Sequence, residues 1–273
     1  MKTLKILVVL TVLVLAGGAA FVWSGVYDIS ATDQHLPPTY WLIEKTMRRS
    51  VAQRGEDIPV PPLGAPQQLE RGLSLYRAHC VQCHGAPGVA PEPFALGLTP
   101  LPAPLVQTGR EWPPQDIFWV VKYGIKMTGM PAWEFRMSDD DIWSVVALVK
   151  KQLPAFSPHA YRNTASPTLE PHTEPAASSH EPSVDRGRTA LQQYAGAACH
   201  TIPGVTGAVA RVGPPLGGIA SRTMLGGVLP NNTENMVRWI REPQRHSPLT
   251  AMPDLGVAER DARDITAYLE TLR

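Results

Sequence analysis

The sequence predicts an all-α protein in which two small domains of the same kind follow an N-terminal membrane-spanning helix. Three observations lead to this prediction. Residues 6–27 carry no charge, five short features recur in the same order in the two halves, and a Pro-rich stretch separates those halves. The chain has 273 residues, 44% of them hydrophobic and 18% charged. This composition agrees with about two folded domains and not with a disordered chain.

The charge balance excludes one large class of function. Lys and Arg number 25 and Asp and Glu 24, which gives a net charge of +1. A nucleic-acid-binding protein needs a concentrated basic footprint, and this composition does not supply one. Pro is abundant at 28 residues and aromatic residues make up only 7%, so we expect many loops and a modest aromatic core. Three Cys cannot build a disulfide framework.

The N-terminus is predicted to anchor the chain in a membrane. Lys2 and Lys5 precede the uncharged stretch Ile6–Tyr27, which is long enough to span a hydrocarbon core of about 30 Å. The lysines should stay on the cytoplasmic side, so the chain from Asp28 onward is exported. A signal peptide cleaved near Gly18-Ala19-Ala20 is the alternative. We favour an uncleaved signal anchor over residues 1–27, because apolar and aromatic residues continue past that cleavage site.

Residues 28–64 are assigned to a juxtamembrane helix and a linker. Pro37-Pro38-Thr39 opens a helix that is predicted from Tyr40 to about Gln53. Tyr40, Ile43, Met47 and Val51 fall on one face of that helix. This face could pack on the neighbouring protein or contact lipid or a membrane partner, and the sequence leaves both interpretations open.

Two copies of one domain follow. The triplets Glu70-Arg71-Gly72 and Asp185-Arg186-Gly187 each begin a predicted helix. Each triplet is followed in the same order by a Cys-His pair, a Pro-Gly pair, a Met-Pro pair and a terminal helix. These features are Cys83-His84 and Cys199-His200, Pro87-Gly88 and Pro203-Gly204, Met130-Pro131 and Met252-Pro253, and residues 138–153 and 257–272. We therefore place the two domains at residues 65–153 and 185–273.

The segment 154–184 between the copies is predicted to be a linker. It is rich in Pro and has no apolar periodicity, which is typical of a semi-extended, poorly ordered chain. Its histidines, His159, His172 and His180, have no spacing that fixes a coordination geometry. We expect them to be solvated side chains and not metal ligands.

The most specific motif is Cys80-Val81-Gln82-Cys83-His84, a C-x-x-C-H sequence. A zinc site needs a second ligand pair, which is missing nearby, and a thioredoxin-like dithiol needs a βαβ context, whereas the surroundings are helix and Pro-rich loop. Covalent haem attachment remains, in which two thiols add to the haem vinyl groups and the adjacent imidazole binds the iron. The motif therefore predicts a haem c on Cys80 and Cys83, with His84 as an iron ligand.

The second iron ligand of this haem is predicted to be a Met. Ligation by His and Met is the electron-carrying arrangement, because soft thioether sulfur favours Fe(II). The candidates are Met127, Met130 and Met137. We choose Met130, because the following Pro131 breaks the helix and holds the loop extended. Met127 and Met137 are expected to be packing residues, as is Met236 in the second half.

With these residues in view, each half resembles a class I cytochrome c domain, and the second is similar to the cytochrome c domain fused to subunit II of some bacterial haem-copper oxidases. The first half matches through Cys80, Cys83, His84 and Gly129-Met130-Pro131-Ala132-Trp133. The second matches through Cys199-His200, residues 212–218, Thr250-Ala251-Met252-Pro253 and residues 264–269. The resemblance implies that His200 and Met252 bind a second iron and that the carbonyl of Pro214 orients His200.

The second half departs from the family pattern at Gly196, where the pattern has a Cys. One thioether is therefore impossible. Either a second haem binds through Cys199, His200 and Met252, or the domain has kept the fold and lost the haem. We favour retention, since Cys199, His200, the Gly-Pro-Pro loop and Met252-Pro253 all remain. This gives two haem c groups per chain, the second attached by Cys199 only.

The resemblance implies an electron carrier and not an enzyme, because six-ligated irons leave no open site. The expected protein is a single-pass component of a bacterial inner membrane with its haem domains on the periplasmic side. It would pass electrons between a quinol-oxidising complex or dehydrogenase and a terminal oxidase. Two alternatives stay open: a peroxidase-like dihaem enzyme, and a monohaem carrier whose second domain is a haem-free docking module.

Overall fold

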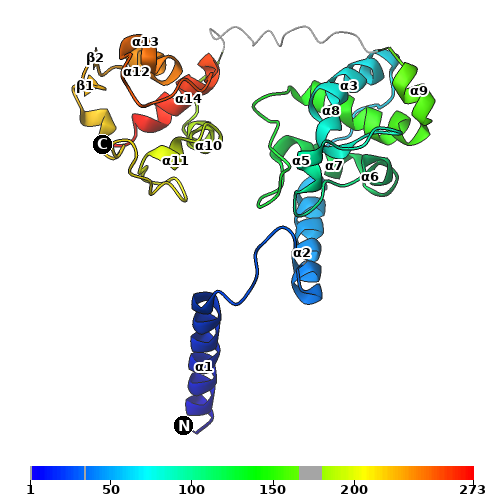
Figure 1. Ribbon diagram of the computed structural model, residues 1–273, viewed down its shortest axis with the longest axis horizontal. Helices are drawn as coiled ribbons and strands as arrows, with labels where there is room; N and C mark the ends of the chain where they lie inside the picture. Colours follow the sequence, from blue (N-terminus) through cyan, green and yellow to red (C-terminus); the bar gives the residue numbers. More distant parts are fainter. Residues whose placement is uncertain (1, 34, 166–179) are drawn as a thin grey trace. The chain divides into compact units, whose positions relative to one another are not determined.

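The computed structural model describes residues 2–33, 35–165 and 180–273, and these are mostly helical (Figure 1). Strand structure within them is limited to a short antiparallel hairpin, β1 (Met224–Leu225) with β2 (Leu229–Pro230). The all-α prediction is therefore confirmed. The chain divides into two compact units, Met1–Leu169 and Glu170–Arg273, which we describe separately.

Helix α1 (Lys2–Ser24) is formed by the uncharged N-terminal stretch. It ends at Ser24, three residues before Tyr27, and is followed by Gly25, whose φ of 62° lies in the left-handed region that favours glycine. None of its residues is buried, and its length and hydropathy are those of a helix that can cross a membrane. An apolar helix that has no buried face in its own protein is stable in the hydrocarbon core of a membrane, where its side chains avoid water. This supports the predicted membrane anchoring.

After α1, the described part of the first unit contains one long α-helix and seven shorter ones. They are α2 (Pro37–Gly55), α3 (Pro66–His79), α4 (Val81–His84), α5 (Pro93–Leu96), α6 (Leu105–Glu111), α7 (Pro114–Tyr123), α8 (Asp139–Ala147) and α9 (Pro158–Asn163). The buried core is formed mainly by α3, α7 and α8, through residues such as Tyr76, Phe118 and Ile142. Helices α3 and α8 are the first and last helices predicted for this domain, and they pack on each other.

The second unit repeats this plan with fewer helices. They are α10 (Val184–Gln193), α11 (Gly196–Cys199), α12 (Thr233–Arg241), α13 (Pro243–His246) and α14 (Glu259–Leu269). Its core gathers Leu191 of α10, Ile240 of α12 and Ile265 of α14. Met236 is only 3% exposed in this core, so its predicted packing role is confirmed.

In each of the two domains, the first and last helices cross at the glycine of the predicted triplet. A Cβ on Gly72 of α3 would clash with the carbonyl oxygen of Ser144 in α8. A Cβ on Gly187 of α10 would clash in the same way with the carbonyl oxygen of Asp264 in α14. Only glycine lets the two backbones approach this closely. The repeated triplet thus marks the same helix crossing in both domains.

The terminal helix of the first domain is less regular than predicted. Ser138 caps α8, accepting a hydrogen bond from the backbone N–H of Asp141, as its position before the helix suggests. After Ala147 the chain continues as a π-helical turn, Leu148–Gln152, and a 3-10 turn, Leu153–Ala155. Gly109 of α6 lies so close to the π turn that a Cβ there would clash with the carbonyl oxygen of Val149. The irregular turn coincides with this close contact.

The ordered part of the first unit extends beyond residue 153, into the segment assigned to the linker. Helix α9 buries Tyr161 in the first core at 4% exposure. Arg77 of α3 donates hydrogen bonds to the backbone carbonyls of Tyr161 and Thr164, at 2.5 and 2.8 Å. A six-residue helix opened by Pro158 has too few turns to show apolar periodicity. Residues 166–179 of the predicted linker, with His172, lie outside the described residues.

The end of the predicted linker is attached to the second unit. The carboxylate of Asp264, whose side chain is 1% exposed, accepts a hydrogen bond from the backbone N–H of Ser183 at 2.7 Å. It also pairs with Arg186 at 2.8 Å and with Nε2 of His180 at 2.9 Å. His180 is therefore not the freely solvated side chain that its surroundings in the sequence suggested, because a buried carboxylate needs partners.

Candidate haem sites

The C-x-x-C-H motif of the first domain occupies a single helical turn. Helix α3 ends at His79, Cys80 follows it as the N-cap of α4, and α4 carries Val81–His84. The backbone N–H groups of Cys83 and His84 both donate to the carbonyl of Cys80, at 3.1 and 3.0 Å. One helical turn therefore carries Cys80, Cys83 and His84, as the two-residue spacer predicts. Burial raises the pKa of the Cys80 thiol to about 12, and the neighbouring Cys83 adds to the effect.

The imidazole of His84 is oriented by a backbone carbonyl. Its Nδ1 lies 2.8 Å from the carbonyl oxygen of Ala103, which leaves Nε2 as the metal-binding nitrogen. Burial lowers the pKa of His84, although the contact with Ala103 acts in the opposite direction. The neutral imidazole is the form that binds a metal. Ala103 was not identified from the sequence, where its only signal is its place between two prolines.

The loop that carries Met130 is held closed by its own hydrogen bonds. The hydroxyl of Thr128 donates to the carbonyl of Ile125 and accepts from the backbone N–H of Met130, at 2.8 and 3.1 Å. The N–H of Ile125 in turn donates to the carbonyl of Met130, at 3.2 Å. Met130 is half-buried at the base of this loop. The structure thus gives the proposed ligand a fixed backbone position.

The other two methionine candidates differ from each other. Met137 is 6% exposed and belongs to the first core, which confirms its predicted packing role. Met127 is 96% exposed, with a φ of 60° at the tip of the loop, so the expectation that it packs in the core is wrong. The loop closes between Ile125 and Met130 and therefore leaves Met127 outside.

A ring contact joins the methionine loop to the C-x-x-C-H turn. The ring centroids of His79 and Trp133 are 5.2 Å apart. His79 directly precedes Cys80, and Trp133 follows Met130 by three residues. The two chain segments that carry the proposed iron ligands therefore lie side by side.

In the second domain the chain enters the corresponding turn through a different backbone conformation. Helix α10 ends at Gln193, and Ala195 takes a left-handed conformation with a φ of 55° before α11 begins. The chain is one residue longer here, because Cys199 follows Arg186 by thirteen residues whereas Cys83 follows Arg71 by twelve. The left-handed turn at Ala195 accommodates the additional residue between α10 and α11. A Cβ at Gly196 would lie 2.9 Å from the carbonyl oxygen of Leu191, closer than ordinary van der Waals contact.

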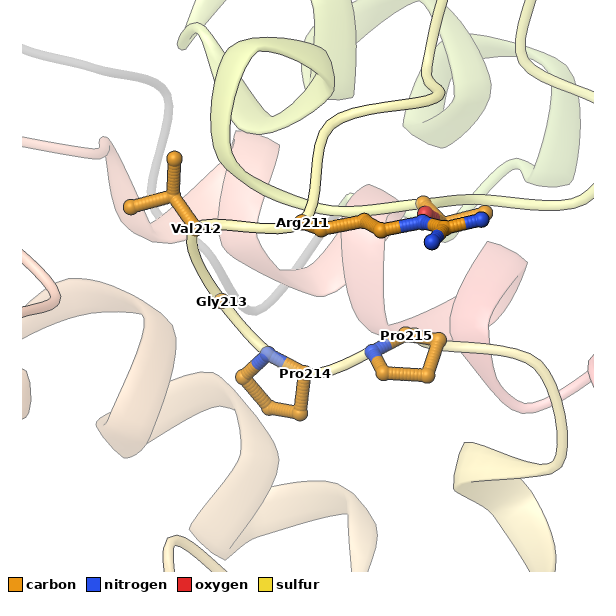
Figure 2. Close-up of a pocket in the computed structure, with 6 residues that line it drawn as sticks. Arg211, Val212, Gly213, Pro214 and Pro215 are labelled. Atoms are coloured by element: carbon orange, nitrogen blue, oxygen red, sulfur yellow. The ribbon is translucent and has the colours of Figure 1, made fainter.

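His200 is held by the Gly-Pro-Pro loop. Its Nδ1 lies 2.7 Å from the carbonyl oxygen of Pro214, which is the contact that the family resemblance implies. Gly213 lies flat against the imidazole, and a Cβ there would come within 2.7 Å of Nδ1. The N–H of Gly213 also donates to the carbonyl of Cys199, at 2.8 Å. Figure 2 shows this loop, which lines a surface pocket of about 590 Å³ from Arg211 to Pro215 together with Thr201.

Met252 lies in a loop that resembles that of Met130. Its backbone N–H donates to the hydroxyl of Thr250, at 3.3 Å, and its side chain is half-buried. In both domains a Tyr hydroxyl also donates a hydrogen bond to the loop that follows the Cys-His pair. Tyr76 donates to the carbonyl of Gly85, and Tyr268 donates to the carbonyl of Pro203, both at 2.6 Å. Each domain thus fixes the loop after its Cys-His pair through a Tyr hydroxyl, from its first helix in one case and from its last in the other.

The residues present fit a haem in each domain. Each domain offers an imidazole with Nδ1 held by a carbonyl and a Met whose backbone N–H donates to a Thr hydroxyl two residues earlier. Large apolar side chains near these ligands in the sequence are exposed, as expected where a porphyrin would cover them: Phe94, Leu96 and Leu101 in the first domain and Val212, Leu249 and Leu255 in the second. Within residues 2–33, 35–165 and 180–273, no three His, Cys, Asp or Glu side chains are grouped to hold a bare metal ion.

Comparison with known families agrees with this reading of the two domains. Residues 67–149 match the family model described as cytochrome c oxidase, cbb3-type, subunit III. Residues 184–273 match the family model described as cytochrome c. Each match covers one of the two domains and includes its Cys-His motif.

Two curated proteins are similar to parts of the chain. Over 93 residues, 33% of this chain and 26% of the relative, it is 33% identical to cytochrome c oxidase subunit 2 of Alkalihalophilus pseudofirmus. Over 142 residues, 50% of this chain and 19% of the relative, it is 30% identical to quinohemoprotein alcohol dehydrogenase of Comamonas testosteroni. The chain thus spans about a quarter or less of the length of these relatives. No solved structure matches it.

Proposed function

Because the chain consists of two cytochrome c-type domains behind an apolar N-terminal helix, we propose that it is a membrane-anchored electron carrier with two haem c groups. The observation that carries the proposal is that each domain has an imidazole held by a backbone carbonyl and a Met whose backbone N–H donates to a Thr hydroxyl two residues earlier. A His and a Met would together supply both protein ligands of a haem iron, which suits electron transfer and would leave no position for a substrate.

Each bound haem would supply an Fe(III)/Fe(II) couple. In the first domain Cys80 and Cys83 would hold the porphyrin by thioethers, and His84 and Met130 would bind the iron, while the carbonyl of Ala103 fixes the imidazole ring. In the second domain Cys199 would form the one available thioether. There His200 and Met252 would be the iron ligands, and Pro214 is the orienting acceptor.

The proposed partners are respiratory. One relative is an oxidase subunit, and the family matched by the first domain is a subunit of a cbb3-type oxidase. We therefore place the chain between a quinol-oxidising complex or dehydrogenase and a terminal oxidase. The other relative is a quinohemoprotein alcohol dehydrogenase, which keeps a dehydrogenase among the proposed electron donors.

The proposed location is the outer face of a bacterial inner membrane. Lys2 and Lys5 flank the start of the apolar stretch and would remain in the cytoplasm, so the haem domains are exported. Covalent haem attachment by C-x-x-C-H is consistent with export of the domains that follow α1.

Intact mass of the membrane-extracted protein tests the proposal. We expect one chain that retains the N-terminal apolar stretch and carries two covalent haems, with a ferrous and ferric absorption spectrum unchanged by CO or peroxide. A chain that begins near Phe21 would contradict the anchor. A single haem, with Cys199 reactive toward a thiol reagent, would identify the second domain as a haem-free docking module. A native-state spectral shift with CO or peroxide would identify a dihaem enzyme instead.

A further inference from the structure

Helix α2 divides into a half that packs on the first domain and a half that does not. Near its C-terminal end Val51 is 2% exposed, and a Cβ on Gly55 would touch the carboxylate of Asp116 in α7, at 2.5 Å. The guanidinium of Arg48 lies 5.2 Å from the ring centroid of Trp112. These contacts fix the second half of the helix to the domain, as one of the two interpretations of the sequence expected.

The first half of α2 exposes apolar side chains on nearly all sides. Tyr40, Trp41, Leu42 and Ile43 are 56%, 59%, 59% and 53% exposed. Four successive residues are spread over about 300° of the circumference, since an α-helix has 3.6 residues per turn. A groove on a protein partner covers one face of a helix and would leave the others in water. A helix that is apolar all round is covered instead by a continuous apolar medium.

Cations follow these apolar residues within two turns. Beyond Glu44, which pairs with Arg48 at 2.7 Å, the charged residues of α2 are all basic: Lys45, Arg48, Arg49 and Arg54. Arg49 lies about 9 Å beyond Ile43 along the axis, at a rise of 1.5 Å per residue. The polar headgroup layer of a bilayer has a similar depth. Tyr and Trp rings favour that interface, and basic side chains favour anionic phosphates.

The membrane is also close along the chain. Twelve residues, 25–36, join the end of α1 to the start of α2. Fully extended, they reach at most about 40 Å. The start of α2 therefore stays near the surface from which α1 emerges.

We infer that residues 37–43 of α2 insert into the headgroup layer of an anionic membrane, with Lys45 and Arg49 against lipid phosphates. The packed second half of the helix then acts as a short stalk that holds the first domain close to the bilayer. This inference rests on the anchoring by α1 and is independent of the haem content of either domain.

The test uses the full haem-loaded chain in nanodiscs of phosphatidylcholine with 30% phosphatidylglycerol. Hydrogen exchange of the backbone amides in peptide 37–49 is measured by mass spectrometry. We expect exchange in residues 37–43 to be at least tenfold slower in the wild type than in a Trp41→Gln, Leu42→Gln double variant. The control Val228→Gln, which changes a 45% exposed apolar residue between β1 and β2 of the second domain, should leave this peptide unchanged. The haem absorption spectrum verifies that each variant is folded.

A second variant tests the contribution of the cations. Lys45→Gln with Arg49→Gln should speed exchange in anionic discs about as much as removing phosphatidylglycerol does for the wild type. Equal exchange in the wild type and the Trp41→Gln, Leu42→Gln variant would overturn the inference. Protection that occurs in native membranes but not in lipid-only discs would overturn it in favour of a protein partner. Release of the whole chain by alkaline carbonate would instead refute the anchor itself.

Discussion

His84 and His200 are each oriented by the carbonyl of a residue in a proline-rich loop, although the loops differ in length. Ala103 follows His84 by 19 residues, and Pro214 follows His200 by 14. The sequence alone allowed the motif residues to be proposed as ligands, since C-x-x-C-H is typical of covalent haem attachment. Ala103 was not, because any backbone carbonyl can accept a hydrogen bond and only the folded loop selects one.

The ligand choice in the first domain gives a prediction at the scale of one residue. Met130→Ala should abolish the sulfur-to-iron charge-transfer absorption and lower the potential of the first haem, because thioether sulfur stabilises Fe(II). Met127→Ala is the matched control, since Met127 is 96% exposed at the tip of the same loop. Absorption spectra and redox titration of both variants decide the matter. Loss of the band in Met127→Ala alone would show that Met130 is not the ligand.

The contact of Gly213 with His200 gives a second residue-scale prediction. Gly213→Ala should push the imidazole away from Pro214 and destabilise the second domain by about 2 kcal/mol, as overpacking in a tight site does. Gly217→Ala is the control in the same loop, where a Cβ would only touch Pro203 at 3.5 Å. Thermal unfolding and the spectrum of the second haem are the readouts. Equal behaviour of the two variants would argue against an orienting role for the loop.

At the scale of elements, an Arg of the first helix pairs with an Asp of the last helix in both domains, but one turn apart. Arg71 binds Asp141 through two hydrogen bonds, of 2.7 and 2.9 Å. Arg186 binds Asp264, which follows Asp261, the counterpart of Asp141, by three residues. In the second domain Asp261 accepts a hydrogen bond from Tyr194 instead, at 2.8 Å. The repeated Arg-Gly pair predicted the helices, whereas the choice of Asp depends on packing that the sequence does not display.

The elements that sequence analysis missed are those formed by tertiary contacts. Helix α9 is short and lies in a Pro-rich segment, so its order depends on Arg77 and on the burial of Tyr161. The π turn at Leu148–Gln152 coincides with the close approach of Gly109. Apolar periodicity predicts long amphipathic helices well and has little to say about short or irregular turns.

The buried carboxylate of Asp264 gives a prediction for acid stability. Burial opposes its charge, but hydrogen bonds from Arg186, from the N–H of Ser183 and from His180 outweigh burial and hold the pKa of Asp264 below its usual value. The stability from these bonds is complete above about pH 4, the pKa of an unfolded Asp, and is lost as the pH falls through the lower folded pKa. Asp264→Asn should therefore cost the second domain about 2 kcal/mol at pH 7 and much less in strong acid.

Unfolding of the second domain, followed by denaturant titration between pH 7 and pH 2.5, measures this effect. The curves of wild type and Asp264→Asn should converge below about pH 4. Asp185→Asn is the control, because that carboxylate of α10 is 87% exposed and makes a surface ion pair with Arg188 of the same helix. A constant difference across the whole pH range would show that Asp264 acts through packing and not through its charge.

At the scale of the whole molecule, the two domains differ in how the chain can hold a haem. The first has both thiols on one turn with His84 inside α4, whereas the second has one thiol and places His200 just beyond α11. Two haems in unlike attachments would give one chain two distinct spectra. The number of domains was predictable from the repeated features. The different backbone conformation before the second Cys-His pair was not, because it becomes visible only in the left-handed turn at Ala195 and the close approach of Leu191 to Gly196.

Gly196 carries the prediction that tests this difference. A haem attached by Cys199 alone keeps one unreacted vinyl group, which lengthens the conjugation of the porphyrin. The α-band of the second ferrous haem should therefore lie at longer wavelength than that of the first. Gly196→Cys should merge the two bands without changing the haem count. Gly196→Ala is the matched control, because it introduces the same Cβ, 2.9 Å from the carbonyl of Leu191, without a thiol.

Gly196→Ala also separates the effect of the added thiol from the steric strain of the added Cβ. If the backbone near Leu191 cannot yield by a few tenths of an ångström, both variants should lose the second haem, and the pyridine haemochrome should halve in each. If it yields, Gly196→Ala should retain the wild-type mixed spectrum, and only Gly196→Cys should merge the bands. Acid extraction should release no haem from wild type or from either haem-loaded variant, since a single thioether is already covalent. Release of half of the haem from the wild type by acid would show that Cys199 is not attached, and that His200 and Met252 alone retain the second haem.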